Sequence, residues 1–291
     1  MRLRNIDRLL LFRTEHDRVL TLEQLQEKYG LPPDGTNFYY GINQINVDAF
    51  ARGGSASALT AAHRAFFAAV LQSLVTGAGD EKTVVLGVEP PSDAKTPYQY
   101  DFVTAHLDLV RRLAADLAEI QAQALAGGKR LDIVVRYASE MNDKHSDPVK
   151  FKASHIAVHT AFQELAPAVP FAFSPALRAD LAEPAIADYW PGSQYVDLIG
   201  GTWYIRGAEQ RARSTANMRA YFVRRVAAGK PFALSEMGGG DAQCRHNDDM
   251  LRAMLHELEA LQLQNVSFEY VSLFLASRWG TDATLGFLET P

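Results

Sequence analysis

Short apolar runs alternate with longer segments of helical spacing along most of this chain. The run at residues 83–88, TVVLGV, is continuous rather than alternating, which is typical of a strand buried on both faces of a parallel sheet. Turn residues such as the Glu-Pro-Pro after it close several of these runs. Eight runs predict strands, at residues 9–13, 38–46, 83–88, 131–137, 170–174, 195–204, 231–235 and 267–276.

Three segments between the predicted strands carry apolar positions on one helical face. The first begins near Val103 and stops at Gly127-Gly128, the second opens at Ser214 and closes on Gly229, and the third starts near Asn247. Strands that alternate with helices form βαβ units with parallel pairing. Eight units predict an α/β fold of the (β/α)8 TIM barrel type. A Rossmann fold is less favoured, because no G-x-G-x-x-G follows an early strand.

The length of 291 residues suits one barrel, and we expect a single catalytic domain over residues 1–291, with two small domains as the alternative. The chain ends about a dozen residues past the last predicted strand, which leaves little room for a full eighth helix. A second subunit or the N-terminal segment could cover the barrel there. The sequence therefore leaves a homo-oligomer open.

Charge and composition exclude some classes of function. A net charge of −5 argues against a nucleic-acid partner and against an anionic membrane surface. The apolar stretch at residues 9–12 is too short for a signal peptide, and no segment is long enough to span a bilayer. The single cysteine, Cys244, excludes an internal disulfide. We therefore expect a cytoplasmic protein from the sequence as it stands, or a secreted one if a signal peptide was removed.

The tripeptide Ser-Glu-Met occurs twice, each time at the end of an apolar run. Its two glutamates, Glu140 and Glu236, are 96 residues apart in the sequence. That spacing is about three βα units of a barrel, whose catalytic residues lie at the carboxyl ends of strands. Inward-pointing side chains three strands apart would bring the two carboxyl groups to roughly 6 Å, near the ~5.5 Å of retaining glycosidases. Such a pair can divide the work of general acid and nucleophile. The ordinary alternative is a glutamate at a helix N-terminus.

Three segments between about residues 131 and 240 resemble one enzyme family, in the right order. RYASEMN, from Arg136 to Asn142, resembles the R-x-x-H-E-M-N-G segment at the end of strand four in glycoside hydrolase family 26, the β-mannanase-type clan A barrels. YWPGSQYVDLIGGTWY at 189–204 is similar to that family's Y-Y-P-G-D-x-Y-V-D-x-x-G-x-x-x-Y. KPFALSEMG is similar to its K-P-I-x-I-x-E-F-G.

The resemblance implies a retaining mechanism without a cofactor or metal, with Glu140 as acid/base and Glu236 as nucleophile. It implies that Tyr204 hydrogen-bonds the nucleophile and that Trp279 forms the floor of a sugar subsite. Arg136 and Asn142 would be polar supports of the acid/base. Aromatic faces suit the C–H face of a pyranose, so Trp203 is a further candidate, although a tryptophan at a strand end is more often plain packing.

The sequence departs from the family at two places. Ser139 stands where the family has histidine, and the segment after Asn142 lacks the expected Gly- and Trp-rich loop. These differences indicate a divergent member and leave the sugar, the linkage and endo or exo action open. They also leave a second function open, a carbohydrate-binding barrel that has lost turnover. A metal-dependent barrel lyase or isomerase is a third.

Other polar residues are weaker candidates. Glu89, at the end of the third predicted strand, and His145, in the loop after the fourth, could contact a substrate. His155 and His159 have the spacing of metal ligands on a helix, but partly exposed surface positions are the more ordinary interpretation. The arginine-rich segment 206–225 could bind an anionic polysaccharide or be a solvated helix face. We interpret His246 as a solvated loop histidine and Cys244 as an inert thiol.

Overall fold

The computed structural model describes most of the chain. It covers residues 8–12, 14–15, 18–19, 27–28, 34–41, 59, 61–76, 80–92, 98–144, 146–178, 180, 186–240 and 248–275.

Nine parallel strands form one sheet. Its order is β6-β5-β4-β1-β11-β10-β8-β7, and β9 also pairs with β10. Only two glycines separate β8 from β9, so these two short strands occupy one strand position in succession. The strands of the sheet are β1 (Leu9–Phe12), β4 (Gly35–Gly41), β5 (Glu81–Glu89), β6 (Arg130–Tyr137), β7 (Ala172–Phe173), β8 (Leu198–Ile199), β9 (Thr202–Arg206), β10 (Phe232–Gly240) and β11 (Phe268–Phe274).

The two ends of this sheet meet. Val135 of β6 forms a parallel bridge with Phe171, just before β7, and the Val135 amide donates to the Pro170 carbonyl at 2.9 Å. Since β6 and β7 lie at opposite ends of the strand order, this bridge is the connection that a closed barrel requires. The eight strand positions follow the predicted order along the chain, which confirms the α/β barrel.

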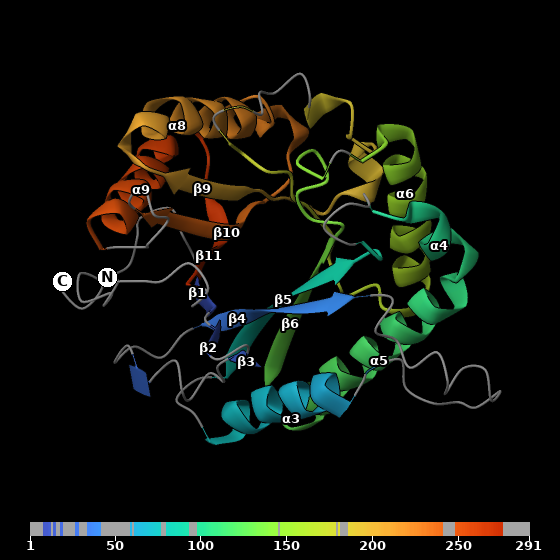
Figure 1. Ribbon diagram of the computed structural model, residues 1–291. Coiled ribbons are helices and arrows are strands. Elements are labelled where there is room, and N and C mark those ends of the chain that lie inside the picture. Colours follow the sequence, from blue (N-terminus) through green and yellow to red (C-terminus); the bar gives the residue numbers. More distant parts are fainter. Residues whose placement is uncertain are drawn as a thin grey trace.

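Figure 1 shows the longer helices arranged around the strands. The helix predicted from Val103 is divided in two at His106, and its second part ends at Gly127 as predicted. The helix predicted from Ser214 begins earlier, at Ala208. The helices are α3 (Ala61–Thr76), α4 (Tyr100–Ala105), α5 (Leu107–Ala126), α6 (Pro148–Leu165), α8 (Ala208–Val223) and α9 (Asp248–Ala260), with 3-10 turns η2 (Ser193–Tyr195), η3 (Val226–Ala228) and η4 (Leu261–Gln264).

A few predicted boundaries differ from the structure. The second strand begins three residues earlier than expected, at Gly35, and β10 continues past Ser235 to Gly240 because β9 pairs with its second half. A short hairpin of β2 (Thr14–Glu15) and β3 (Arg18–Val19) was not predicted. The region of the expected eighth helix lies outside the described residues. Among the helices that are described, none is both long and apolar enough to cross a membrane.

Two apolar layers account for the continuous apolar runs. A small inner cluster takes single residues from seven strands, and a large outer cluster packs the other strand face against the helices. On β5, for example, Val84 and Leu86 belong to the outer cluster and Val85 to the inner one. The inner cluster consists of Leu10, Val85, Val134, Ala172, Leu198, Ala233 and Tyr270. Because side chains alternate along a strand, this layer fixes which residues face the barrel axis.

Candidate active site

Polar side chains gather at the carboxyl ends of the strands. Arg136 lies two residues after Val134 on β6, and Glu89 lies four residues after Val85 on β5. Because side chains alternate along a strand, both point to the inner face, as the two valines do. Tyr204 and Glu236 come from β9 and β10, whose ends are paired with each other. This end of a barrel is where catalytic residues of such folds lie.

A bulge in β10 turns Glu236 inward. Ala233 belongs to the inner cluster, so simple alternation would direct Ser235 inward and Glu236 outward. In the pairing with β11, however, Leu234 is opposite Val271 and Met237 is opposite Leu273, so β10 contains one extra residue between these pairs. A bulge re-aims the side chains around it. Glu236 therefore reaches Arg136 inside the barrel while Met237 packs in the outer cluster.

Arg136 holds Glu236 within a network of four strand positions. Its Nη1 donates to Glu236 Oε1, its Nε donates to Ser174 Oγ at 3.0 Å, and its Nη2 donates to Thr202 Oγ1 at 2.8 Å. Tyr204 OH donates to the other Glu236 oxygen at 2.7 Å. Arg136 is 1% exposed, so this pair is buried and each ion depends on the other. Arg136 was expected beside the acid/base, but the structure pairs it with Glu236.

Glu140 lies in a turn directly after β6, in different surroundings. Its backbone has φ 55°, and Ala138 has φ 48°, both in the left-handed region that residues other than glycine seldom adopt. The turn is held by the Glu140 amide, which donates to the Ser174 carbonyl at 3.0 Å. Burial, followed by the negative charge of Glu236, raises the pKa of Glu140 to about 7, against the opposing influence of Arg136. The Glu140 amide donates to the Ser174 carbonyl, and the Ser174 hydroxyl accepts from Arg136, which also binds Glu236. The two glutamates therefore belong to one hydrogen-bonded network at the carboxyl ends of the strands.

A third carboxylate, Glu89, supports this turn. Ser139 Oγ donates to Glu89 Oε1, and Tyr98 OH donates to Glu89 Oε2 and, at 3.1 Å, to the Ser139 carbonyl. Burial raises the pKa of Glu89, while Arg136 and these two hydroxyl groups oppose the shift. We call Glu89, Tyr98 and Ser139 the Glu89 cluster. Both oxygens of Glu89, expected as a substrate contact, thus already accept hydrogen bonds from residues next to Glu140.

Asn142 connects two loops at the mouth of the barrel. Its Nδ2 donates to the Ala176 carbonyl at 3.0 Å, and its Oδ1 accepts from the Ala176 amide at 2.8 Å. These paired bonds tie the segment after β6 to the segment after β7. Asn142 therefore supports the turn of Glu140 through the backbone, and each polar atom of its amide group already makes one hydrogen bond to Ala176.

Trp203 does not face the interior of the barrel. Thr202 and Tyr204 on either side of it point inward, so strand alternation sends Trp203 to the outer layer. Trp203 is 0% exposed, and its Nε1 donates to Ser214 Oγ of α8 at 3.1 Å. The prediction that its ring lies against a sugar is wrong in this structure. Phe274 was not among the predicted site residues. Its ring packs edge-on to that of Tyr204, with the ring centroids 6.1 Å apart, and strand alternation places it on the same inner face as Tyr270.

The remaining candidates separate into two groups. His155 and His159 were expected to be partly exposed, but both are buried. His155 Nε2 donates to the Tyr195 carbonyl at 2.9 Å, and His159 Nε2 lies 3.6 Å from Asp197 Oδ2. Within the described part of the chain, no three His, Cys, Asp or Glu side chains are grouped so that they could hold a metal ion. The other candidates lie outside the described residues, namely His145, Trp279, Cys244 and His246.

Comparison with known proteins supports the same fold. No protein-family model matches the sequence, and no curated protein matches it. Among solved structures, a GH26 β-mannanase from Bacteroides ovatus has a TM-score of 0.58 and 14% identity, over 94% of this chain and 81% of its own. GH26C from a Muricauda species has a TM-score of 0.65 and 11% identity, over 96% and 80%. The GH26 endo-β-1,4-mannanase catalytic domain of Bacillus sp. JAMB-750 has a TM-score of 0.62 and 16% identity, over 94% and 77%.

These structural neighbours are glycoside hydrolases with TIM-barrel folds. The low identities mean that the likeness establishes the fold and leaves the chemistry to the residues of this chain. The resemblance to family 26 that the motifs predict is confirmed at that level, as a divergent chain with the fold of those enzymes.

Proposed function

We propose that this chain, as one catalytic domain over residues 1–291, is a retaining glycoside hydrolase that cleaves a β-linked oligo- or polysaccharide. Glu236 is the nucleophile and Glu140 the general acid/base. One observation carries the proposal: two carboxyl groups at the same end of the barrel have different surroundings. Glu236 lies between a guanidinium and a tyrosine hydroxyl, whereas the pKa of Glu140 is raised to about 7 by burial and by the charge of Glu236.

The reaction takes two steps. In the first, Glu236 attacks the anomeric carbon while Glu140 gives its proton to the glycosidic oxygen, so the C–O bond to the leaving sugar breaks as the glycosyl-enzyme ester forms. In the second, Glu140 removes a proton from water, which attacks the same carbon and releases Glu236 as a carboxylate. The proton gained by Glu140 restores the starting state.

The other residues have supporting roles. Arg136 and Tyr204 fix both oxygens of Glu236, which leaves the nucleophile one orientation relative to a bound sugar. Asn142 and the Glu89 cluster hold the turn that carries Glu140. By resemblance, Trp279 would form the floor of a sugar subsite. His145 is a further candidate contact because of its place in the loop after the fourth predicted strand. The printed names of the structural neighbours, which describe β-mannanases, make β-mannosides the first substrates to test.

A fluorosugar experiment tests the nucleophile and the sugar together. The full chain would be incubated with a panel of 2-deoxy-2-fluoro glycosyl fluorides, because the fluorine slows breakdown of the glycosyl-enzyme ester. We expect one or more sugars to add a single covalent label, seen by intact mass, on the peptide that contains Glu236. A label on another residue would contradict the assignment of Glu236.

Azide rescue tests the two roles separately. In Glu236→Ala, azide can replace the missing nucleophile and give a glycosyl azide of inverted configuration. In Glu140→Ala, azide instead attacks the intact glycosyl-enzyme and gives a product of retained configuration. The matched control is Glu89→Gln, a third carboxyl of the same mouth, which azide should not rescue. The same stereochemistry in both catalytic variants would rule out these assignments.

The second candidate, a carbohydrate-binding barrel without turnover, is favoured by Ser139, which stands in place of the family's histidine. In the structure Ser139 donates to Glu89, so the position still takes part in the support of Glu140. The same sugar panel separates the two functions. Binding of an oligosaccharide with neither hydrolysis nor covalent labelling would select the binding barrel.

A further inference from the structure

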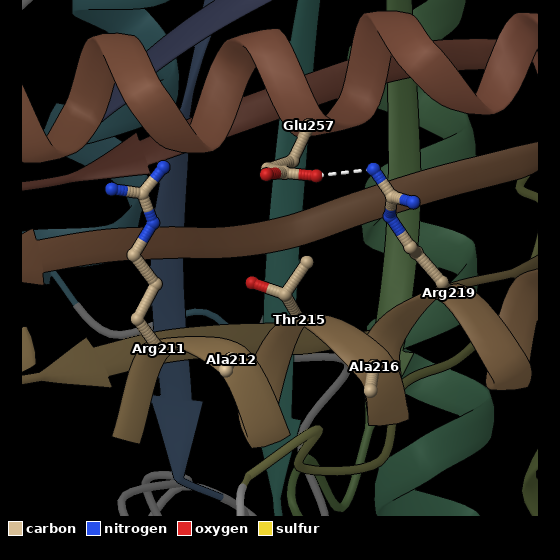
Figure 2. Close-up of a pocket in the computed structure, with 6 residues that line it drawn as sticks. All are labelled: Arg211, Ala212, Thr215, Ala216, Arg219 and Glu257. Carbon is tan, nitrogen blue, oxygen red and sulfur yellow. Dashed lines mark hydrogen bonds and ion pairs between the residues drawn. The ribbon is translucent and has the colours of Figure 1, made fainter. Parts of the chain in front are cut away.

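A cavity lies on the outer wall of the barrel, between α8 and α9, and neither Glu140 nor Glu236 lines it. It has a volume of about 460 Å³. Figure 2 shows Arg211 and Arg219 rising from α8 on either side of it, with Glu257 reaching in from α9 and Thr215 between the arginines. The lining residues are Arg211, Ala212, Thr215, Ala216, Arg219 and Glu257.

The cavity is built by one face of α8. Arg211, Thr215 and Arg219 are spaced four residues apart, so they form one row on the helix, with a rise of about 6 Å per step. Ala212 and Ala216 also line the cavity, and their small side chains leave space between the larger ones. The two arginines therefore extend over the same space from Cα positions about 12 Å apart.

This cavity offers more hydrogen-bond donors than the protein satisfies. Thr215 is 8% exposed, and its Oγ1 has no hydrogen-bond partner among the described residues; the same holds for Arg219 Nε. Arg219 Nη2 donates to Glu257, which cancels one positive charge. Arg211 is exposed and forms no ion pair within the described part of the chain. A buried polar group without a partner is unusual enough to indicate a missing ligand or water.

We propose that this cavity binds an oxyanion: a carboxylate, sulfate or phosphate group. The planar guanidinium presents paired N–H donors that match two oxygens of such a group, and the Thr215 hydroxyl adds a third donor between the two arginines. With Glu257 included, the lining has a net charge of +1. The anion could belong to an acidic sugar in a glycan chain or be a free inorganic ion. The site is independent of the roles proposed for Glu140 and Glu236.

Titration calorimetry on the full chain tests the site at low, constant ionic strength. The probes are sodium sulfate, sodium phosphate and trigalacturonate, with mannotriose as a neutral control. We expect at least one oxyanion to bind and mannotriose to give no heat that depends on Arg211. A trigalacturonate affinity more than tenfold above that of sulfate assigns the site to an acidic glycan, and equal or higher affinity for the inorganic ions assigns it to a free anion.

Three substitutions make the test specific. Arg211→Gln should weaken binding at least tenfold. Arg213→Gln, the same charge change on an exposed residue of α8 that does not line the cavity, should change binding less than twofold. Glu257→Gln should tighten binding several-fold, a gain that misfolding cannot produce. The proposal is overturned if no oxyanion binds, if Arg213→Gln weakens binding as much as Arg211→Gln, or if Glu257→Gln binds no more tightly than the unmodified chain.

Discussion

Glu140 and Glu236 have the same neighbours in sequence, Ser before and Met after, yet their carboxyl groups differ in what they contact. Glu236 is fixed by Arg136 and Tyr204, whereas Glu140 lies in a strained turn near a second negative charge. The chemistry of each residue is therefore set by the fold around it. The next three predictions follow from this difference.

The first prediction concerns the pH dependence of turnover. Glu140 must be protonated to act as an acid, and its pKa is raised to about 7, so we expect kcat/KM to fall about tenfold per pH unit above that value. On substrates with a good leaving group, Glu140→Gln should keep a low residual activity, and its pH profile should lack this alkaline limb. The measurement is kcat/KM for an aryl glycoside between pH 4 and 10. An unchanged alkaline limb in Glu140→Gln would assign that limb to another group.

The second prediction concerns stability. Because the pKa of Glu140 is higher in the folded protein than in the unfolded chain, the folded state binds more protons between pH 4.5 and about 7, and stability falls as pH rises through that window. Glu140→Gln removes this cost. We expect it to raise Tm by roughly 2 to 4 °C at pH 8 and to leave Tm nearly unchanged at pH 4. An equal change at both pH values would show that the charge is not responsible.

The third prediction concerns the Glu89 cluster. Tyr98→Phe removes the hydroxyl that donates to Glu89 and to the Ser139 carbonyl, which loosens the turn before Glu140. We expect kcat to fall about tenfold, the cost of a hydrogen bond to a charged group, with a smaller change in KM and a displaced alkaline limb.

Tyr100→Phe is the matched control, because Tyr100 packs edge-on to Tyr98 at 6.0 Å and belongs to α4 rather than to the cluster. It should alter Tm without moving the pH profile. The positioning role of Tyr98 is contradicted if both variants shift the alkaline limb equally.

At the scale of single elements, β9 places adjacent residues on opposite sides of the barrel wall, and this gives the fourth prediction. Tyr204→Phe removes the hydroxyl from Glu236 and should lower kcat/KM about ten- to a hundredfold with little change in Tm. Trp203→Phe removes the bond to Ser214 and should cost about 1 to 2 kcal/mol of unfolding free energy while kcat/KM stays within twofold. The reverse pattern would show that Trp203 faces the substrate.

The sequence patterns predicted the strands and helices better than they predicted the site. The apolar runs predict all eight strand positions, because strands buried on both faces leave a signal that depends on local residues alone. Because side chains alternate along β9, Trp203 and Tyr204 cannot both face the interior. The incorrect prediction that Trp203 contacts a sugar could therefore have been avoided. The bulge that turns Glu236 inward is different, because it exists only in the pairing of β10 with β11.

The Glu89 cluster was equally hidden from the sequence. Tyr98 lies nine residues beyond Glu89, outside any predicted element, and Ser139 lies 50 residues further along than Glu89. Nothing local indicates that their hydroxyl groups meet on one carboxylate. The family pattern showed only that a histidine was missing, and the structure shows what its replacement contacts.

At the scale of the whole molecule, Arg136 and the barrel wall depend on each other. The bridge between β6 and the start of β7 joins the ends of the sheet, and one residue further along β6 Arg136 connects Ser174, Thr202 and Glu236 across the interior. The candidate nucleophile is thus held by the same contacts that link four strand positions. Closure of the barrel and orientation of Glu236 are expected to be lost together.

The last prediction concerns the acid stability of the whole fold. His155 of α6 is 0% exposed and donates to the Tyr195 carbonyl. Burial lowers its pKa from 6.5 to about 4, with a smaller contribution from His159 in the same direction and opposing contributions from the Tyr195 carbonyl and Asp197. The unfolded chain therefore binds a proton between pH 6.5 and 4 that the folded protein does not, and stability falls as pH is lowered through this window.

Over that window the loss attributable to His155 is about 3 kcal/mol, at 1.36 kcal/mol per pKa unit. His155→Gln can still donate to the Tyr195 carbonyl but cannot take up the proton, so its unfolding free energy, measured in urea at pH 6.5 and at pH 4, should fall by about 3 kcal/mol less than that of the unmodified protein. His256→Gln, a substitution of an exposed histidine on α9, should follow the unmodified protein. Parallel losses in all three would place the acid sensitivity in the carboxylates instead.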